Sequence, residues 1–322
     1  MSVSPLTLLV LLAPLVACTG KTDDTATPAG DDTADTAVDG GPAELAPLSS
    51  GACPDFSTSG TSTFLSSDEE RQVTVVIPSS PGTAMPVNFF FHGVADPASS
   101  TNPGGDTASA LDLQALADST NTVWIVPDAP VQNLLGVMNV YLWDLTLSTD
   151  HDLVLYDDLR TCAAQNLDVD LSRLSIVGFS GGALWTTVIT VHRADTIATA
   201  VELSGGSDVT APGFDTLLAE YTTPVTGLPV LLTTGADAVD VWPSTSMVVV
   251  DFAAATDTLQ GELLADSHFV VRCQDDNGHE MGRKDWNIAQ DWLAAHSFGQ
   301  PSPYATDGLG NNADWCAVAA AE

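Results

Sequence analysis

The sequence predicts an α/β domain built on a mostly parallel, doubly wound sheet of about eight strands. Short apolar runs typical of buried strands alternate along the chain with longer stretches of helical periodicity. Several of these runs end in loops that carry glycine beside a chemically active residue. Residues 51–322 are long enough for one large domain of this class, and no internal repeat is visible.

The individual elements follow from the same pattern. The segment between the strands near 204 and 229 is too short for a large lid, so we expect an open cleft at the carboxyl ends of the strands. Strands are expected near 61–65, 71–77, 87–91, 122–126, 173–178, 198–204, 229–234 and 267–273, and helices near 107–119, 152–166, 181–193, 256–264 and 284–296.

Ser180 is the predicted chemical centre of the chain. It stands in a Gly-x-Ser-x-Gly pattern over residues 178–182, after an apolar strand-like run and before a helix-like stretch. A nucleophile on such a sharp strand-to-helix turn brings the residues two before and two after it close together, where a Cβ would clash. Gly178 and Gly182 occupy those two places.

Three further loops have the expected order for this chemistry. A buried-strand signal over residues 85–91 ends in His92-Gly93-Val94, where an esterase with this motif has its oxyanion-hole loop. Downstream, one predicted strand opens into a loop with Asp237, and the next opens into a loop with His279. The order serine, acid, histidine, each after a strand, is that of an α/β-hydrolase triad.

Taken together, these motifs resemble the secreted α/β-hydrolase esterases of the polyhydroxybutyrate-depolymerase and feruloyl-esterase group, over roughly residues 50–298. The resemblance implies Ser180 as nucleophile, His279 as general base and Asp237 as the acid. The oxyanion would be held by the backbone N–H groups of Gly181 and Val94.

The acid loop departs from the group's pattern. That group usually has Gly-x-Ala-Asp-Pro-Val-Val, whereas this loop, residues 235–240, is one residue shorter before its first aspartate. Asp240 therefore remains an alternative to Asp237, and Asp275 and Asp276 are further acids near the site. Trp242 follows the same loop and is a candidate wall of the substrate cleft, whereas Trp143 and Trp185 are better explained as core residues.

The N-terminus resembles a bacterial lipoprotein signal. Residues 1–17 form an apolar stretch too short to span a bilayer, with no Lys or Arg before it, and Leu15 to Cys18 resembles a lipobox. Cys18 would then carry the lipid, although an ordinary signal peptide is the alternative. Residues 18–50 are rich in Thr, Asp, Ala, Gly and Pro, which favours a disordered linker between that anchor and the catalytic domain.

The charge excludes several partner classes. With 42 acidic and 8 basic residues, the formal net charge is −34, so Coulomb repulsion opposes nucleic acid and anionic membrane surfaces. No cysteine or histidine cluster with metal-ligand spacing is present, and the sequence implies neither a metal nor an organic cofactor.

Four cysteines remain besides Cys18, an even number that suggests two disulfides in a secreted chain. Their spacing leaves the pairing open. The fold of the family they resemble implies the pairs Cys53–Cys162 and Cys273–Cys316.

The expected function is an extracytoplasmic serine esterase that hydrolyses a neutral ester, with polymeric esters among the candidates. Candidate substrates are polyhydroxyalkanoate-like polyesters or the feruloyl and acetyl esters of polysaccharides. A serine peptidase on the same fold and a catalytically inactive binding lipoprotein are the alternatives.

Overall fold

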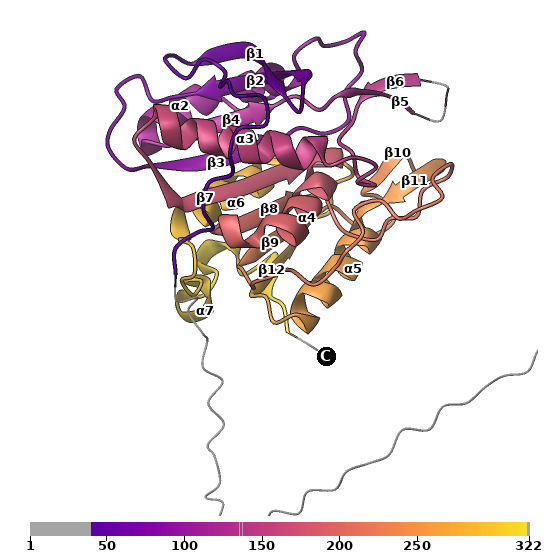
Figure 1. Ribbon diagram of the computed structural model, residues 1–322. Coiled ribbons are helices and arrows are strands. Elements are labelled where there is room, and N and C mark those ends of the chain that lie inside the picture. The colour runs from indigo at the N-terminus through magenta and orange to yellow at the C-terminus, as the bar shows by residue number, and fades with distance from the viewer. Residues whose placement is uncertain (1–39, 135, 137, 321–322) are drawn as a thin grey trace, which may run out of the picture. The chain divides into compact units, whose positions relative to one another are not determined.

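The computed structural model describes residues 40–134, 136 and 138–320. These residues build a nine-stranded mixed sheet with the strand order β1-β2-β4-β3-β7-β8-β9-β12-β13 (Figure 1). The six neighbours from β4 to β12 pair in parallel, and antiparallel strands extend both edges. The bounds are β1 Gly60–Ser66, β2 Glu69–Val76, β3 Met85–Phe91, β4 Val123–Pro127, β7 Val169–Phe179, β8 Thr199–Leu203, β9 Val230–Thr234, β12 Val270–Gln274 and β13 Cys316–Val318.

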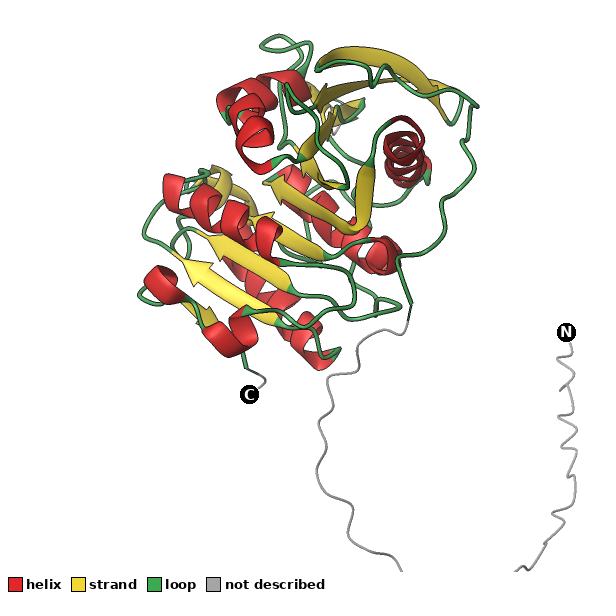
Figure 2. Ribbon diagram, turned by 90° about the vertical axis from the view of Figure 1, so that its left-hand side faces the viewer, coloured by secondary structure: helices red, strands yellow, loops and turns green. Residues whose placement is uncertain are grey.

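Helices cover both faces of the sheet, as Figure 2 shows. Each central strand divides its buried side chains between two cores with the period of two that a strand imposes. On β7, for example, Leu174 and Ile176 belong to one core and Val177 to the other. The first core packs against α3 His151–Asn166, α4 Gly181–Arg193 and α5 Phe252–Ala265, and the second against α1 Pro103–Ala110, α2 Leu113–Thr120 and α6 Arg283–Ala295.

The predicted fold class and the eight predicted strands are confirmed, with differences at the periphery. The expected helix over 107–119 is two helices, α1 and α2, because Asp112 between them has a left-handed φ of 50°. Strand β13 and the short helix α7 Tyr304–Asp307 near the C-terminus were not predicted. Two hairpins were also missed: β5 Val131–Leu134 with β6 Met138–Tyr141, and β10 Val241–Ser244 with β11 Met247–Asp251.

The start of the domain differs from the predicted linker boundary at residue 50. The guanidinium of Arg160 in α3 donates to the carbonyl oxygens of Ala43 and Glu44. The backbone N–H of Ser49 donates to the Asp158 carboxylate over 2.8 Å. Polar side chains of α3 thus bind this low-complexity segment, a tertiary contact that composition does not reveal.

Both disulfides join the cysteines expected from the family resemblance. Cys53–Cys162 links the segment before β1 to α3. Cys273–Cys316 links residues that face each other in the β12–β13 ladder.

The expected signal peptide over 1–17 and the lipidation site Cys18 lie outside the described residues, as does most of the expected linker. Among the described helices, none is both long and apolar enough to cross a bilayer.

Candidate active site

Ser180 lies at the turn between β7 and α4, with φ 57° and ψ −126°. A Cβ on Gly178 would come within 2.1 Å of the carbonyl oxygen of Gly182, and a Cβ on Gly182 within 2.0 Å of the carbonyl oxygen of Phe91. Only glycine allows these backbone segments to approach so closely. The close approach expected around the serine is thereby confirmed.

His279 faces Ser180 from the loop that follows β12. Its Nε2 lies 2.8 Å from the Ser180 Oγ. The imidazole is held between two phenyl rings, with ring centroids 4.2 Å from Phe252 and 5.1 Å from Phe179. The two phenyl rings therefore fix the plane of the imidazole, and its Nε2 points at the Ser180 hydroxyl.

The carboxylate that contacts His279 belongs to Asp240, and the expectation for Asp237 is wrong. Asp240 is fully buried, and its Oδ1 lies 2.8 Å from Nδ1 of the imidazole. Asp237 is exposed and accepts a hydrogen bond from the side chain of Gln274 over 2.6 Å. The cause is a single turn after β9, in which the N–H groups of Val239 and Asp240 both donate to the carbonyl of Ala236. That turn directs Asp237 to solvent and Asp240 to the histidine.

Asp240 receives two further hydrogen bonds on its other oxygen. The hydroxyl of Ser204 donates to Oδ2 over 2.7 Å and the backbone N–H of Gly235 over 2.9 Å. Sequence reasoning missed Ser204, whose only signal is its place in a Ser-Gly-Gly run directly after β8. With three donors, the carboxylate is oriented firmly toward the histidine.

The acid loop and the histidine loop are also joined through their backbones. The N–H of Ala236 donates to the carbonyl of Asn277 over 2.9 Å. A Cβ on Gly235 would come within 2.3 Å of that same carbonyl oxygen, so glycine is required there. Asp237, through Gln274, adds a side-chain contact between the same two loops.

The backbone segments that carry the two expected oxyanion donors, the N–H groups of Gly181 and Val94, lie close together beside Ser180. Gly181 is the first residue of α4, where an N–H has no partner within the helix. A Cβ on Gly181 would lie 3.5 Å from the backbone nitrogen of Val94. On Gly93 it would lie 3.0 Å from the Ser180 Cβ. This geometry suits two donors to one oxygen near Ser180, as an oxyanion hole requires.

His92 holds the loop that carries Val94. The N–H of Ala129 donates to its Nε2 over 3.0 Å, so the ring proton is on Nδ1, which donates to the carbonyl of Gly93 over 2.6 Å. Burial lowers the pKa of His92 to about 4, because desolvation disfavours the charged ring. The indole N–H of Trp143 donates to the His92 carbonyl over 3.0 Å. His92 is thus a neutral structural residue beside the site.

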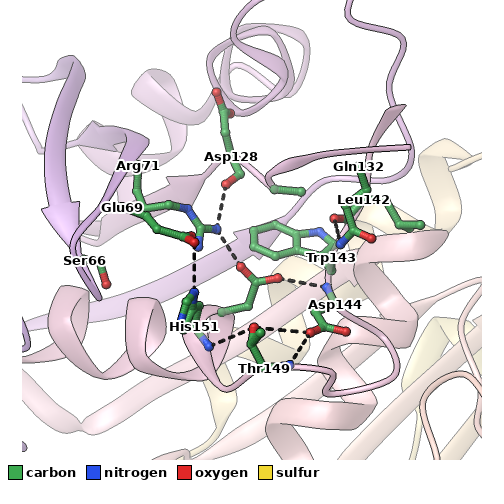
Figure 3. Close-up of polar contacts among 12 residues, drawn as sticks. Ser66, Glu69, Arg71, Asp128, Gln132, Leu142, Trp143, Asp144, Thr149 and His151 are labelled. Carbon is green, nitrogen blue, oxygen red and sulfur yellow. Dashed lines mark hydrogen bonds and ion pairs between the residues drawn. The ribbon is translucent and has the colours of Figure 1, made fainter. Parts of the chain in front are cut away.

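A buried ion pair supports both segments that bind His92. The guanidinium of Arg71 contacts Asp152 over 2.7 Å and also donates to the carbonyl of Asp128, next to Ala129. Asp152 in turn accepts the backbone N–H of Asp144, next to Trp143, over 2.9 Å. Figure 3 shows the guanidinium of Arg71 beside Asp128, whose carbonyl it contacts. This one ion pair therefore positions residues 128–129 and 143–144 against the loop of residues 92–94, which carries the expected oxyanion donor Val94.

Polar contacts of three other histidines, His151, His268 and His296, are made with groups other than Ser180. His151 contacts Glu69, His268 binds the carbonyl of Leu228, and His296 binds the carbonyl of Trp292 and the hydroxyl of Ser302. Trp143 and Trp185 are buried and stack on each other with centroids 5.8 Å apart, in agreement with a core role.

Two cavities meet at Ser180, and Trp242 forms part of the wall of both. The larger, of about 600 Å³, extends under the β10–β11 hairpin and is lined almost wholly by apolar side chains. The smaller, of about 360 Å³, includes His279, Asp106 and Thr107. Within the described part of the chain, no group of three or more His, Cys, Asp or Glu residues is arranged to hold a metal ion.

Comparisons with known proteins support the fold. No family model and no curated protein matches the sequence. The chain is similar to the crystal structure of native pOPH, with a TM-score of 0.65 and 18% identity, covering 84% of this chain and 98% of that one. For native sOPH the TM-score is 0.60 at 17% identity, with coverage of 83% and 96%. A thermostable esterase matches with a TM-score of 0.52 and 16% identity over 74% of this chain and 63% of its own.

These similarities, with the topology above, show that the chain has the α/β-hydrolase fold.

Proposed function

We propose that this protein is a serine esterase that hydrolyses neutral carboxylic esters through an acyl-enzyme on Ser180. The observation that carries the proposal is the continuous chain from Ser180 Oγ to His279 Nε2 and from His279 Nδ1 to Asp240 Oδ1, each contact 2.8 Å long. A serine hydroxyl needs such a base because it is a weak nucleophile at neutral pH.

The roles follow from the positions of the groups. As Ser180 Oγ attacks the ester carbonyl, His279 Nε2 takes its proton, and Asp240 stabilises the resulting imidazolium. The N–H groups of Gly181 and Val94 hold the tetrahedral oxyanion, each worth about 3–4 kcal/mol in the barrier. His279 then returns the proton to the leaving alkoxide. Water, activated by the same base, hydrolyses the acyl-enzyme and restores Ser180.

The substrate class is narrowed by charge and by the cavities. A net charge of −34 disfavours anionic substrates. A neutral, polymeric ester such as a polyhydroxyalkanoate-like polyester, or a feruloyl or acetyl ester of a polysaccharide, agrees with this charge and with the access to Ser180 from two cavities.

The two disulfides and the N-terminal sequence favour a place outside the cytoplasm. There the enzyme is held by a lipid on Cys18 and faces the periplasm or the exterior. The lipid is its only membrane attachment in this proposal, and nucleic acid is not a partner.

The test is covalent labelling of the full chain with a fluorophosphonate probe, together with turnover of matched ester and amide substrates. We expect labelling of the wild type at Ser180, none of Ser180→Ala, and hydrolysis of esters well above amides. Equal or faster hydrolysis of amides would identify the protein as a peptidase instead. A folded wild type that is neither labelled nor active would refute both enzymes and favour the catalytically inactive binding lipoprotein.

A further inference from the structure

The larger cavity beside Ser180 has a composition that the general esterase mechanism does not require. Among the described residues that line it, Ser180 has the only hydroxyl and none carries a charge. Much of its wall comes from Leu142 and Leu145, from residues 211–218 and from the β10–β11 hairpin, and the β5–β6 hairpin, α4 and the start of α5 also contribute. At about 600 Å³, the cavity is far larger than an acetyl group needs and lies within the range that holds a whole drug-sized ligand.

The geometry of proton transfer decides which half of an ester enters this cavity. His279 must reach the leaving oxygen, so the alcohol half lies on the histidine side. His279 lines the smaller cavity but not the larger one. Gly181, Val94 and Leu184 all line the larger cavity, so the acyl substituent of a carbonyl held between Gly181 and Val94 has that cavity beside it.

We propose, on the basis of the esterase function above, that the larger cavity is the acyl site and that it selects an extended aliphatic acyl chain over an acetyl or feruloyl group. An acetyl group leaves most of the cavity empty. A feruloyl group brings a phenolic hydroxyl, and apart from Ser180 and the indole N–H of Trp242 the described wall residues have no side chain with a polar N–H or O–H group to pair with it. Aliphatic chains bury only methylenes there, and each methylene adds binding free energy.

The first test is a series of p-nitrophenyl esters from acetate to dodecanoate on the full chain. We expect kcat/KM to rise by up to about fourfold per methylene from acetate to at least octanoate. A steady fall beyond acetate or butyrate would overturn the proposal. The smaller cavity receives p-nitrophenol throughout, so the series varies only the acyl half.

A pair of variants connects the preference to the cavity. Ala211 is buried in the cavity wall, and Ala211→Phe adds a ring there. We expect the ratio of octanoate to acetate kcat/KM to fall at least tenfold. Val225→Phe adds a ring at an exposed position outside both cavities and should leave that ratio unchanged. Equal ratios in Ala211→Phe and wild type would overturn the assignment.

A binding measurement separates this proposal from the proposed function. With Ser180→Ala, calorimetry should detect tighter binding of p-nitrophenyl decanoate than of the acetate. Equal affinities would refute the acyl site even if the wild type hydrolyses esters. Tighter decanoate binding together with an inactive wild type would support the site and refute the esterase.

Discussion

The hydroxyl of Ser204 donates to the Asp240 oxygen that does not face His279, over 2.7 Å. Ser204 lies at the end of β8 with a left-handed φ of 53°, whereas Asp240 follows β9, so the contact joins the ends of neighbouring parallel strands. Ser204 is a positioning residue that acts on the histidine through the aspartate.

Ser204→Ala should lower kcat about tenfold for a p-nitrophenyl ester and leave KM nearly unchanged, because Asp240 loses one of its three donors while the substrate cavities stay intact. Ser207→Ala, on the same segment, removes a hydroxyl that binds Glu262 instead and is the matched control. A rise in KM with constant kcat would contradict the positioning role.

The two aspartates of the acid loop should differ sharply in their effect. Asp240→Asn is expected to reduce kcat by about 10³–10⁴, since the charge that holds the imidazole tautomer is lost. Asp237→Asn should be mild, because Asp237 is exposed and, among the described side chains, forms a hydrogen bond only with Gln274. Steady-state kinetics on both purified variants decides this, and the reverse order would refute the assignment of Asp240.

Glu202 of β8 is fully buried against α4 and accepts hydrogen bonds from the Thr187 hydroxyl and the Gly206 N–H. The Thr187 hydroxyl lies 2.8 Å from the carbonyl of Gly206 and 2.7 Å from Glu202 Oε1, yet it has one proton. That single proton is divided between two acceptors, which leaves Glu202 Oε1 poorly compensated for its burial. Burial accordingly raises the pKa of Glu202 to about 8, and the N–H of Gly206 donates to its other oxygen.

This raised pKa predicts a pH-dependent stability. Between about pH 4.5 and 8 the folded protein retains a proton that the unfolded chain has released, so Glu202 lowers stability as pH rises, by about 1.4 kcal/mol per unit. Glu202→Gln preserves a donor and an acceptor and should remove this slope. Urea unfolding of both proteins at several pH values measures the difference, and parallel curves would show that Glu202 does not titrate in this window.

Replacing only one partner of the Arg71–Asp152 ion pair should lower the free energy of unfolding strongly. Both side chains are about 4% exposed or less, so Arg71→Met leaves an unpaired buried carboxylate and should destabilise the fold by about 3–5 kcal/mol. The double variant Arg71→Met with Asp152→Leu should recover part of that loss. Urea unfolding provides the comparison, and a double variant less stable than Arg71→Met would contradict this account.

Membrane attachment is tested at Cys18. Expressed in a bacterial host that processes lipoproteins, the wild type should partition into detergent and incorporate labelled fatty acid, and Cys18→Ser should do neither. Mass spectrometry of a wild-type N-terminus without acyl mass would contradict the lipid anchor without affecting the esterase proposal.

The elements of the structure that the sequence predicts well are those determined by the pattern of neighbouring residues. The buried strands and the helices α3 and α4 follow from apolar periodicity, and the turn at Ser180 follows from Gly178 and Gly182. Asp240 was only an alternative, because one turn of backbone decides whether it or Asp237 faces the histidine, and that turn depends on contacts between two loops. The β10–β11 hairpin has no clear alternation and was missed, although it forms much of the larger cavity.

The Cys53–Cys162 disulfide also determines how the domain meets a mechanical load. Any force applied along the chain N-terminal to the domain reaches Cys53 before β1, an edge strand held by a single neighbour. The covalent bond passes the tension directly into α3, which packs against the core of the sheet. Strand β1 is bypassed, so pulling on the N-terminus does not peel the sheet from its edge.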